Sequence, residues 1–220
     1  EVVSASASVG AEQEYFLVLD EYYQKRMDLK LTGRALFGAM APKGQELEDH
    51  YFGSLKRKVA AFMKDLDEEL WKYGIPSKTK HNEVAPAQHE VACVYAKMNI
   101  TTDNNHLLMN IMQDVAKKHG LRCLLHEKPF AGVNGSGKHD NFSIIANTGL
   151  NLFNPGNDPL HNIPFLAALA CTIKGVDEYA DLLRMSIASA GNDHRLGADE
   201  AQPAIISMFL GDELNQVIDS

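Results

Sequence analysis

The sequence has few cysteines, no long apolar run and no excess of basic residues. Its three cysteines are far apart and form no CxxC pair, so we expect neither a disulfide framework nor a zinc site, and a reducing, cytoplasmic location fits best. No stretch of about 18 uninterrupted apolar residues is present, so we expect no membrane span. The formal net charge of −8 argues against a nucleic-acid partner.

Signs of a complete chain are also missing. The first residue is not Met, residues 1–6 do not form a signal peptide, and residues 205–218 still have a helical pattern where the sequence stops. We therefore expect a fragment of a longer protein. Its 220 residues are enough to bury a core, and one domain is the first expectation.

The spacing of apolar residues predicts a mixture of helices and strands. Helical spacing extends over residues 55–73 and 102–119. We predict strands at 8–19, 78–83, 88–95, 121–125 and 138–146. We also predict a long loop at 31–53, a tight turn at 134–137, a long helix within 159–190 and a last helix at 203–218. Because these elements follow no regular βαβ rhythm, the expected fold class is α+β with a largely antiparallel sheet.

Four glutamates form two pairs on the predicted strands. Glu12 and Glu14 are two residues apart, so their side chains point to the same face. Glu83 and Glu90 flank a corner at Pro86, which forces an extended or turned backbone and lets two strands bring both carboxylates to one point. Neighbouring carboxylates repel unless a cation lies between them or water screens them. For each pair taken alone, an exposed strand edge is at least as good an interpretation.

A glycine-rich segment precedes the strand predicted at 138–146. Residues 134–139 read NGSGKH, and the two glycines let backbone N–H groups approach a ligand closely. The segment is not a Walker A loop, because the GxxxxGK[ST] spacing and the following helix are absent. Beyond it, His139, Asn141 and Ser143 share one face of the strand. A simple glycine-rich hairpin turn is the alternative.

Two arginines complete the set of candidate residues. Arg195 lies in a polar segment, residues 191–198, where a planar guanidinium suits contact with phosphate. Arg184 lies within the preceding predicted helix, and a solvated surface position is the commoner explanation for both. Taken together, the carboxylates, the histidine, the glycine-rich segment and the arginines favour metal-bridged phosphoryl transfer. Oxygen-rich ligands favour Mg²⁺ or Mn²⁺ over Zn²⁺.

Several segments, in order along the chain, resemble signature sequences of glutamine synthetases. The family signatures are matched by residues 10–16 (GAEQEYF), 81–90 (HNEVAPAQHE) and 134–139 (NGSGKH). The long type III subgroup in particular is matched by residues 43–53, 124–130 (LLHEKPF) and 192–198 (NDHRLGA). The resemblance covers nearly the whole chain. It implies the curved antiparallel sheet packed with helices that glutamine synthetases share with guanido kinases. Residues 1–220 would be the central part of the catalytic domain, without the amino-terminal β-grasp domain and the carboxy-terminal part.

The resemblance also implies a reaction and a role for each candidate residue. Glutamate attacks the γ-phosphate of ATP, and ammonia then displaces phosphate from the γ-glutamyl phosphate to give glutamine. The first metal would be held by Glu14, Glu83 and Glu90, and the second by Glu12 and His139. Substrate contacts would come from Asn134, Gly135 and Arg184. Nucleotide contacts would come from Asn141, Ser143 and Arg195. Arg195, which faces the transferred phosphoryl group, and Glu83 would be catalytic.

The sequence also departs from the family pattern. A further glutamate ligand of the second metal, further arginines and the acid that helps to activate ammonium belong to segments that this sequence does not contain. Asn141 stands where other subgroups have a histidine. We therefore expect the fragment alone to be incomplete and the full-length protein to form a homo-oligomer. Three alternatives stay open: a related ligase that uses another amine, a guanidino kinase, which the paired glutamates disfavour, and a non-catalytic homologue or fragment with a scaffold role.

Overall fold

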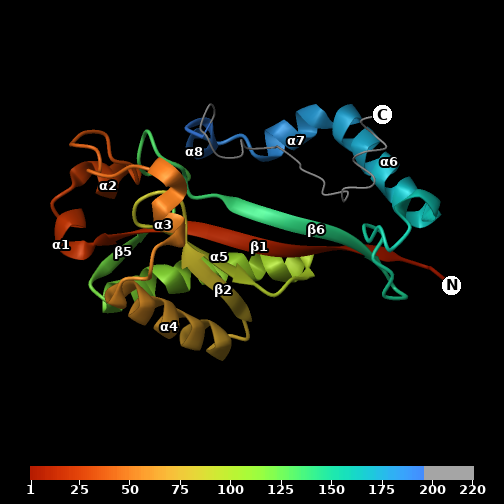
Figure 1. Ribbon diagram of the computed structural model, residues 1–220, viewed down its shortest axis with the longest axis horizontal. Helices are drawn as coiled ribbons and strands as arrows, with labels where there is room; N and C mark the ends of the chain where they lie inside the picture. Colours follow the sequence, from red (N-terminus) through yellow and green to blue (C-terminus); the bar gives the residue numbers. More distant parts are fainter. Residues whose placement is uncertain (196–220) are drawn as a thin grey trace.

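The fold is organised around one long central strand, β1 (Ala5–Leu19). The computed structural model describes residues 1–195, so the helix predicted at 203–218 lies outside the described residues. Strand β1 belongs to an antiparallel sheet with β2 (Ser77–Asn82), β3 (Gln88–Cys93), β4 (Ala96–Lys97), β5 (Leu121–Leu124) and β6 (Lys138–Ala146). It pairs with β4 and β3 along one edge and with β6 and β5 along the other, while β2 pairs with β3 (Figure 1). The α+β fold with an antiparallel sheet is confirmed.

Two amphipathic helices cover one face of this sheet. Helices α4 (Arg57–Lys72) and α5 (Met98–Lys118) lie below it in Figure 1. Their buried residues form the main core with Tyr15, Leu17 and Val91 of the strands. Successive strand residues point to opposite faces, so the odd-numbered residues of β1 face these helices. The even-numbered residues, Glu12 and Glu14 among them, therefore face the other side.

The remaining helices lie at the other side and at one end of the sheet. Between β1 and α4 the chain forms α1 (Asp20–Tyr23), α2 (Met27–Thr32), the 3₁₀ turn η1 (Glu46–Glu48) and α3 (Asp49–Phe52). After β6 it forms η2 (Pro159–His161), α6 (Ile163–Glu178), α7 (Ala180–Ser186) and α8 (Ala190–Asp193). Figure 1 shows α6, α7 and α8 on the side of the sheet away from α4 and α5. A second, smaller core joins Phe16, Leu29, Ala85 and Leu124.

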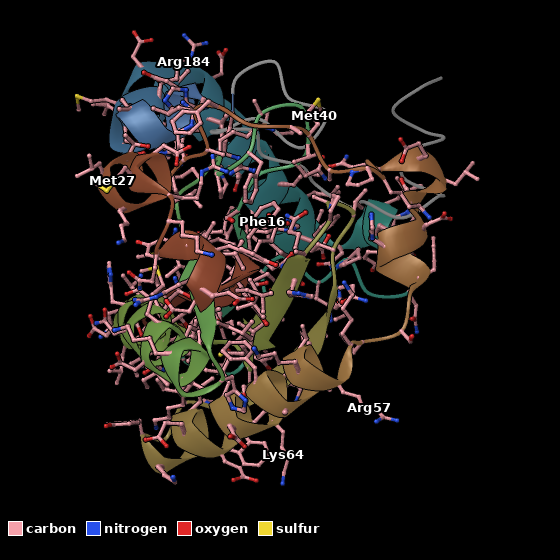
Figure 2. The ribbon with its side chains drawn as sticks, turned by 90° about the vertical axis from the view of Figure 1, so that its left-hand side faces the viewer. Phe16, Met27, Met40, Arg57, Lys64 and Arg184 are labelled. Carbon is pink, nitrogen blue, oxygen red and sulfur yellow. The ribbon has the colours of Figure 1, made fainter. Side chains whose placement is uncertain are left out.

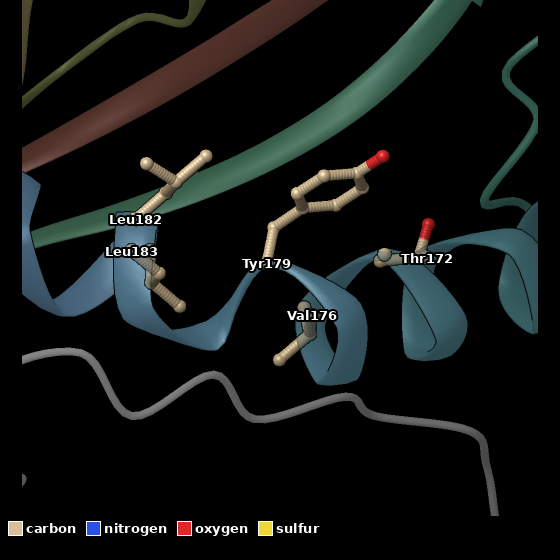
Figure 3. Close-up of a pocket in the computed structure, with 6 residues that line it drawn as sticks. Thr172, Val176, Tyr179, Leu182 and Leu183 are labelled. Carbon is tan, nitrogen blue, oxygen red and sulfur yellow. The ribbon is translucent and has the colours of Figure 1, made fainter.

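An open pocket lies along α6 and α7. Its lining is mainly apolar and consists of Thr172, Gly175, Val176, Tyr179, Leu182 and Leu183 (Figure 3). Within residues 1–195, none of the helices combines the length and the apolar character that crossing a membrane requires.

The structure confirms most of the predicted elements and corrects three local ones. The strand at 138–146 has the predicted bounds, and the long helix within 159–190 is present as α6, followed by α7. The region 31–53 is not a continuous loop, because the end of α2, η1 and α3 interrupt it. Helix α8 begins at Ala190 and occupies the start of the segment predicted to be a polar loop. The third correction concerns residues 134–137, which do not form the predicted tight turn.

Two neighbouring leucines of α5 test how the core stabilises this fold. The Leu108 side chain is 1% exposed and belongs to the main core, whereas Leu107 is 37% exposed. We expect Leu108→Ala to lower the free energy of unfolding by about 3 kcal/mol, because it removes buried methyl groups and leaves a cavity. The matched change Leu107→Ala should cost less than about 1 kcal/mol. Urea denaturation followed by circular dichroism measures both, and equal losses would contradict the assignment of the core.

Candidate active site

The register of three strand pairs gathers the candidate residues on the face opposite α4 and α5. Glu12 lies directly opposite His139 of β6, and Glu14 lies opposite Glu90 of β3. Glu90 in turn lies opposite His81 of β2. Residues directly opposite each other in an antiparallel pair have side chains on the same face. Four strands, β1, β2, β3 and β6, therefore present their carboxylates and imidazoles to one region.

Glu12 and its neighbours on β6 form the more exposed part of the site. The His139 Nδ1 atom lies 3.0 Å from Glu12 Oε2, and Asn141 Nδ2 donates a 2.9 Å hydrogen bond to Glu12 Oε1. The structure thus joins three of the predicted residues through one carboxylate. Ser143 is two positions further along β6, and its hydroxyl accepts a hydrogen bond from Asn151 Nδ2 at 3.3 Å.

Three carboxylates form the more buried part. Glu14 and Glu83 are each 9% exposed, and Glu90 is 8% exposed. Burial raises the pKa of Glu90 above its ordinary value, and the negative charge of Glu12 raises it further, while His81 and His139 act in the opposite direction. Buried carboxylates are costly unless a cation or hydrogen-bond donors compensate for the lost water.

His81 is a member of this group that the sequence did not single out as a ligand. Its Nδ1 atom lies 3.4 Å from Glu83 Oε1, and its Nε2 atom lies 3.1 Å from Glu90 Oε1. One ligand atom from each of these three residues lies within 4.8 Å of the other two. The available signal was alternation along β2, which places His81 on the same face as Glu83.

Glu14 connects the carboxylates to the glycine-rich segment. Its Oε2 atom accepts hydrogen bonds from the Gly137 N–H at 2.6 Å and from Gln88 Nε2 at 3.4 Å. A Cβ atom added at Gly137 would lie 3.0 Å from this oxygen and 3.2 Å from Arg195 Nη2. The Glu14 carboxylate and the Arg195 guanidinium therefore both lie against Gly137, as a candidate phosphate-contacting arginine near a metal site would require.

The prediction of a tight turn at residues 134–137 is wrong. The chain turns at residues 131–132, where Gly132 has a φ of 78°, and residues 134–137 have an irregular backbone that leads directly into β6. Neither Gly135 nor Gly137 has a positive φ. Gly135 is needed for a different reason, because a Cβ there would lie 2.1 Å from the Glu127 carbonyl oxygen. Close packing against another backbone segment, rather than a reversal of the chain, explains the glycine.

Hydrogen bonds from other segments hold residues 134–136 in place. The Asn134 N–H donates to Gln45 Oε1 at 2.5 Å, and Gln45 Nε2 donates back to Asn134 Oδ1 at 2.9 Å. The Ser136 N–H donates to the Glu127 carbonyl oxygen at 2.9 Å, and Gln88 Nε2 donates to the Gly135 carbonyl oxygen at 2.8 Å. The buried Ser136 hydroxyl has no hydrogen-bond partner among residues 1–195. Gln45 escaped the sequence analysis because a glutamine within a loop carries no pattern.

Glu127 also supports the segment that carries Arg195. A Cβ at Gly191 would lie 1.9 Å from Glu127 Oε2, so the carboxylate packs directly against the Gly191 backbone. Ser189 caps α8 by accepting a hydrogen bond from the Asn192 N–H at 3.1 Å. Through its carbonyl and its carboxylate, Glu127 thus contacts both the glycine-rich segment and the α8 region.

Arg184 is not brought to the carboxylates. Its side chain is 76% exposed on α7, where its ion-pair partner is Asp181 at 3.8 Å. In Figure 2 Arg184 lies at the top of the molecule, far from Lys64 of α4 at the bottom and beyond the central Phe16. The described geometry therefore gives Arg184 no contact with the group formed by the other predicted residues.

The remaining side chains fit divalent cations. Carboxylate oxygens from β1, β3 and the β2–β3 corner converge with imidazole nitrogens of β2 and β6. Carboxylate oxygen is the preferred ligand of Mg²⁺, and imidazole is accepted by Mn²⁺ and other transition metals.

Sequence comparisons find glutamine synthetases among the relatives of this chain. A glutamine synthetase of Butyrivibrio fibrisolvens is 62% identical over 218 residues, which are 99% of this chain and 31% of that protein. A type-3 glutamine synthetase of Dictyostelium discoideum is 52% identical over 215 residues, which are 98% of this chain and 29% of that protein. This chain spans about a third of the length of these curated relatives.

A solved structure supports the fold. The cryo-EM structure of Plasmodium falciparum glutamine synthetase matches with a TM-score of 0.65 at 20% identity, over 89% of this chain and 40% of that chain. The family model described as glutamine synthetase, catalytic domain, matches residues 3–204. The chain belongs to the glutamine synthetase catalytic-domain family.

Proposed function

We propose that the protein containing this chain makes glutamine from glutamate, ammonia and ATP through a γ-glutamyl phosphate intermediate. The observation that carries the proposal is the strand register, which places Glu12, Glu14, Glu90 and His139 on one face of the sheet in a chain of this family. In the first step a glutamate carboxylate oxygen attacks the γ-phosphorus of ATP, and ADP leaves. In the second step ammonia attacks the acyl carbon, inorganic phosphate leaves, and the nitrogen loses a proton.

We infer that the site holds two divalent cations, Mg²⁺ or Mn²⁺. Glu14, Glu83 and Glu90 would hold the first cation, and Glu12 and His139 would hold the second. When bound, the cations neutralise charge on the phosphates and on the reacting carboxylate. The burial of the first three carboxylates supports this assignment, because a cation offsets the cost of placing them together.

The chain's own residues would position and stabilise the reacting groups. Asn134 and Gly135 would contact the amino-acid substrate. The hydrogen bonds between Asn134 and Gln45, and the one from the Ser136 N–H to the Glu127 carbonyl oxygen, keep that segment ordered before the substrate binds. Arg195, which lies against Gly137, would stabilise the negative charge that develops on the transferred phosphoryl group.

The remaining roles rest on family membership more than on contacts. Asn141 and Ser143 would bind the nucleotide. The hydrogen bond that Asn141 donates to Glu12 supports the role of Asn141, because Glu12 is a proposed ligand of the second cation. Arg184 would bind the substrate carboxylate only if α7 has another position in the whole protein. We extend the proposal to a cytoplasmic homo-oligomer, an inference that rests on the family alone.

The purified protein provides the direct test. We expect phosphate release from ATP that requires glutamate and ammonium together, with glutamine formed in equal amount. Phosphate release with other amines but not with ammonium would identify a related ligase and overturn the proposal.

Glu14→Ala tests the first cation site. We expect glutamine synthesis to fall by at least about a hundredfold, because the variant removes a proposed cation ligand that also accepts the Gly137 N–H. The matched change Glu68→Ala removes an exposed glutamate of α4 that pairs with Lys64, and it should leave activity unchanged. Circular dichroism checks that both variants fold, and full activity in a folded Glu14→Ala variant would refute the role of Glu14.

Gly135→Ala tests the packing of the glycine-rich segment. The new Cβ would meet the Glu127 carbonyl oxygen, so the segment must shift, and we expect the KM for glutamate to rise about tenfold or more. Gly175→Ala is the matched control, because no atom of residues 1–195 lies within 4 Å of a Cβ at this position in α6. It should leave the KM unchanged and the melting temperature equal or higher. An unchanged KM in Gly135→Ala would contradict the proposed contact.

A further inference from the structure

His81 has one ring nitrogen whose role is settled by its neighbour. The Nδ1 atom lies 2.8 Å from the carbonyl oxygen of Asn82. A carbonyl oxygen only accepts hydrogen bonds, so Nδ1 carries a proton and donates it. The ring of Tyr51, from α3, packs edge-on against the imidazole with 5.3 Å between ring centroids. The orientation of His81 is thus set by a hydrogen bond on one side and an aromatic contact on the other.

The other ring nitrogen, Nε2, faces a carboxylate. The Nε2 atom lies 3.1 Å from Glu90 Oε1, so both atoms are placed to offer an electron pair to one cation between them. Two electron-pair donors at this separation attract only when a proton or a cation lies between them. Two ligands that are each about 2.1 Å from one cation, and at right angles to each other, are about 3 Å apart. The observed separation matches such a pair, and one ligand atom of Glu83 lies within 4.8 Å of one ring nitrogen of His81 and of one carboxylate oxygen of Glu90.

We propose that His81 is a nitrogen ligand of the first cation and makes that site prefer Mn²⁺ over Mg²⁺. The identification of this cation as the one used for catalysis rests on the proposed function, but the ligand assignment does not. Mg²⁺ favours an all-oxygen environment, whereas imidazole nitrogen suits the first-row transition metals. The nitrogen therefore adds affinity for Mn²⁺ and little for Mg²⁺. His81→Asn removes the imidazole and retains a polar side chain.

The experiment measures cation binding without glutamate, ammonium or ATP. Pulsed electron paramagnetic resonance of bound Mn²⁺ detects coupling to a directly coordinated ¹⁴N nucleus. His139→Asn serves as the background, because His139 is the imidazole proposed for the second cation. We expect a ¹⁴N coupling in His139→Asn that disappears in the double variant His81→Asn/His139→Asn. His161→Asn/His139→Asn is the matched control, because the exposed His161 pairs with Asp158, away from the strands of the site, and this variant should keep the coupling.

Titration calorimetry supplies the second readout. We expect His81→Asn to weaken Mn²⁺ binding about tenfold or more and to change Mg²⁺ binding less than about threefold. Absence of ¹⁴N coupling in His139→Asn, which has an intact His81, overturns the proposal even if the double variant fails to fold. Equal weakening of both cations by His81→Asn also overturns it. Because no substrate is present, a protein that makes no glutamine would still support the ligand assignment if the coupling is found.

Discussion

The pairing of β1 on both edges is the constraint on which the site depends. Glu12 is opposite His139 on one side, and Glu14 is opposite Glu90 on the other. A shift of either partner strand by one residue would move its ligand to the face covered by α4 and α5. The main core resists such a shift of β3, because its Val91 must stay against the helices beside Tyr15 and Leu17 of β1. The apolar packing on one face therefore maintains the polar arrangement on the other.

The site contains buried carboxylates, which are electrostatically unfavourable, next to closely packed backbone segments. Glu14, Glu83 and Glu90 are buried, and burial together with the negative charge of Glu12 raises the pKa of Glu90. Backbone and side-chain donors stabilise part of this charge, as the Gly137 N–H does for Glu14. Around these groups, Gly135 packs against the Glu127 carbonyl and Gly191 packs against the Glu127 carboxylate. Glu127 thus contacts both the glycine-rich segment and the segment that carries Arg195.

Sequence reasoning succeeded where structure follows a local period. Apolar spacing predicted helices at 55–73 and 102–119, which the structure has at 57–72 and 98–118, and alternation in β1 placed Glu12 and Glu14 together. It failed where the cause is a contact between distant segments. Residues 134–137 have the two glycines that are typical of a turn. Gly135 is instead required because the Glu127 carbonyl oxygen occupies the space that a Cβ would need. The pairing of Gln45 with Asn134 spans 89 residues and leaves no local pattern.

By itself, the sequence determined the amphipathic helices, the strand faces and, through its ordered motifs, the family. Those properties depend on side-chain type and on spacing within one element, both of which can be read along the chain. Only the tertiary structure decided that His81 joins Glu83 and Glu90, that Arg195 lies against Gly137, and that Arg184 does not reach the carboxylates. These outcomes depend on strand register and on packing between distant segments. A contact between residues far apart in sequence leaves no periodic pattern in either segment, so it cannot be predicted from the spacing of residues along the chain.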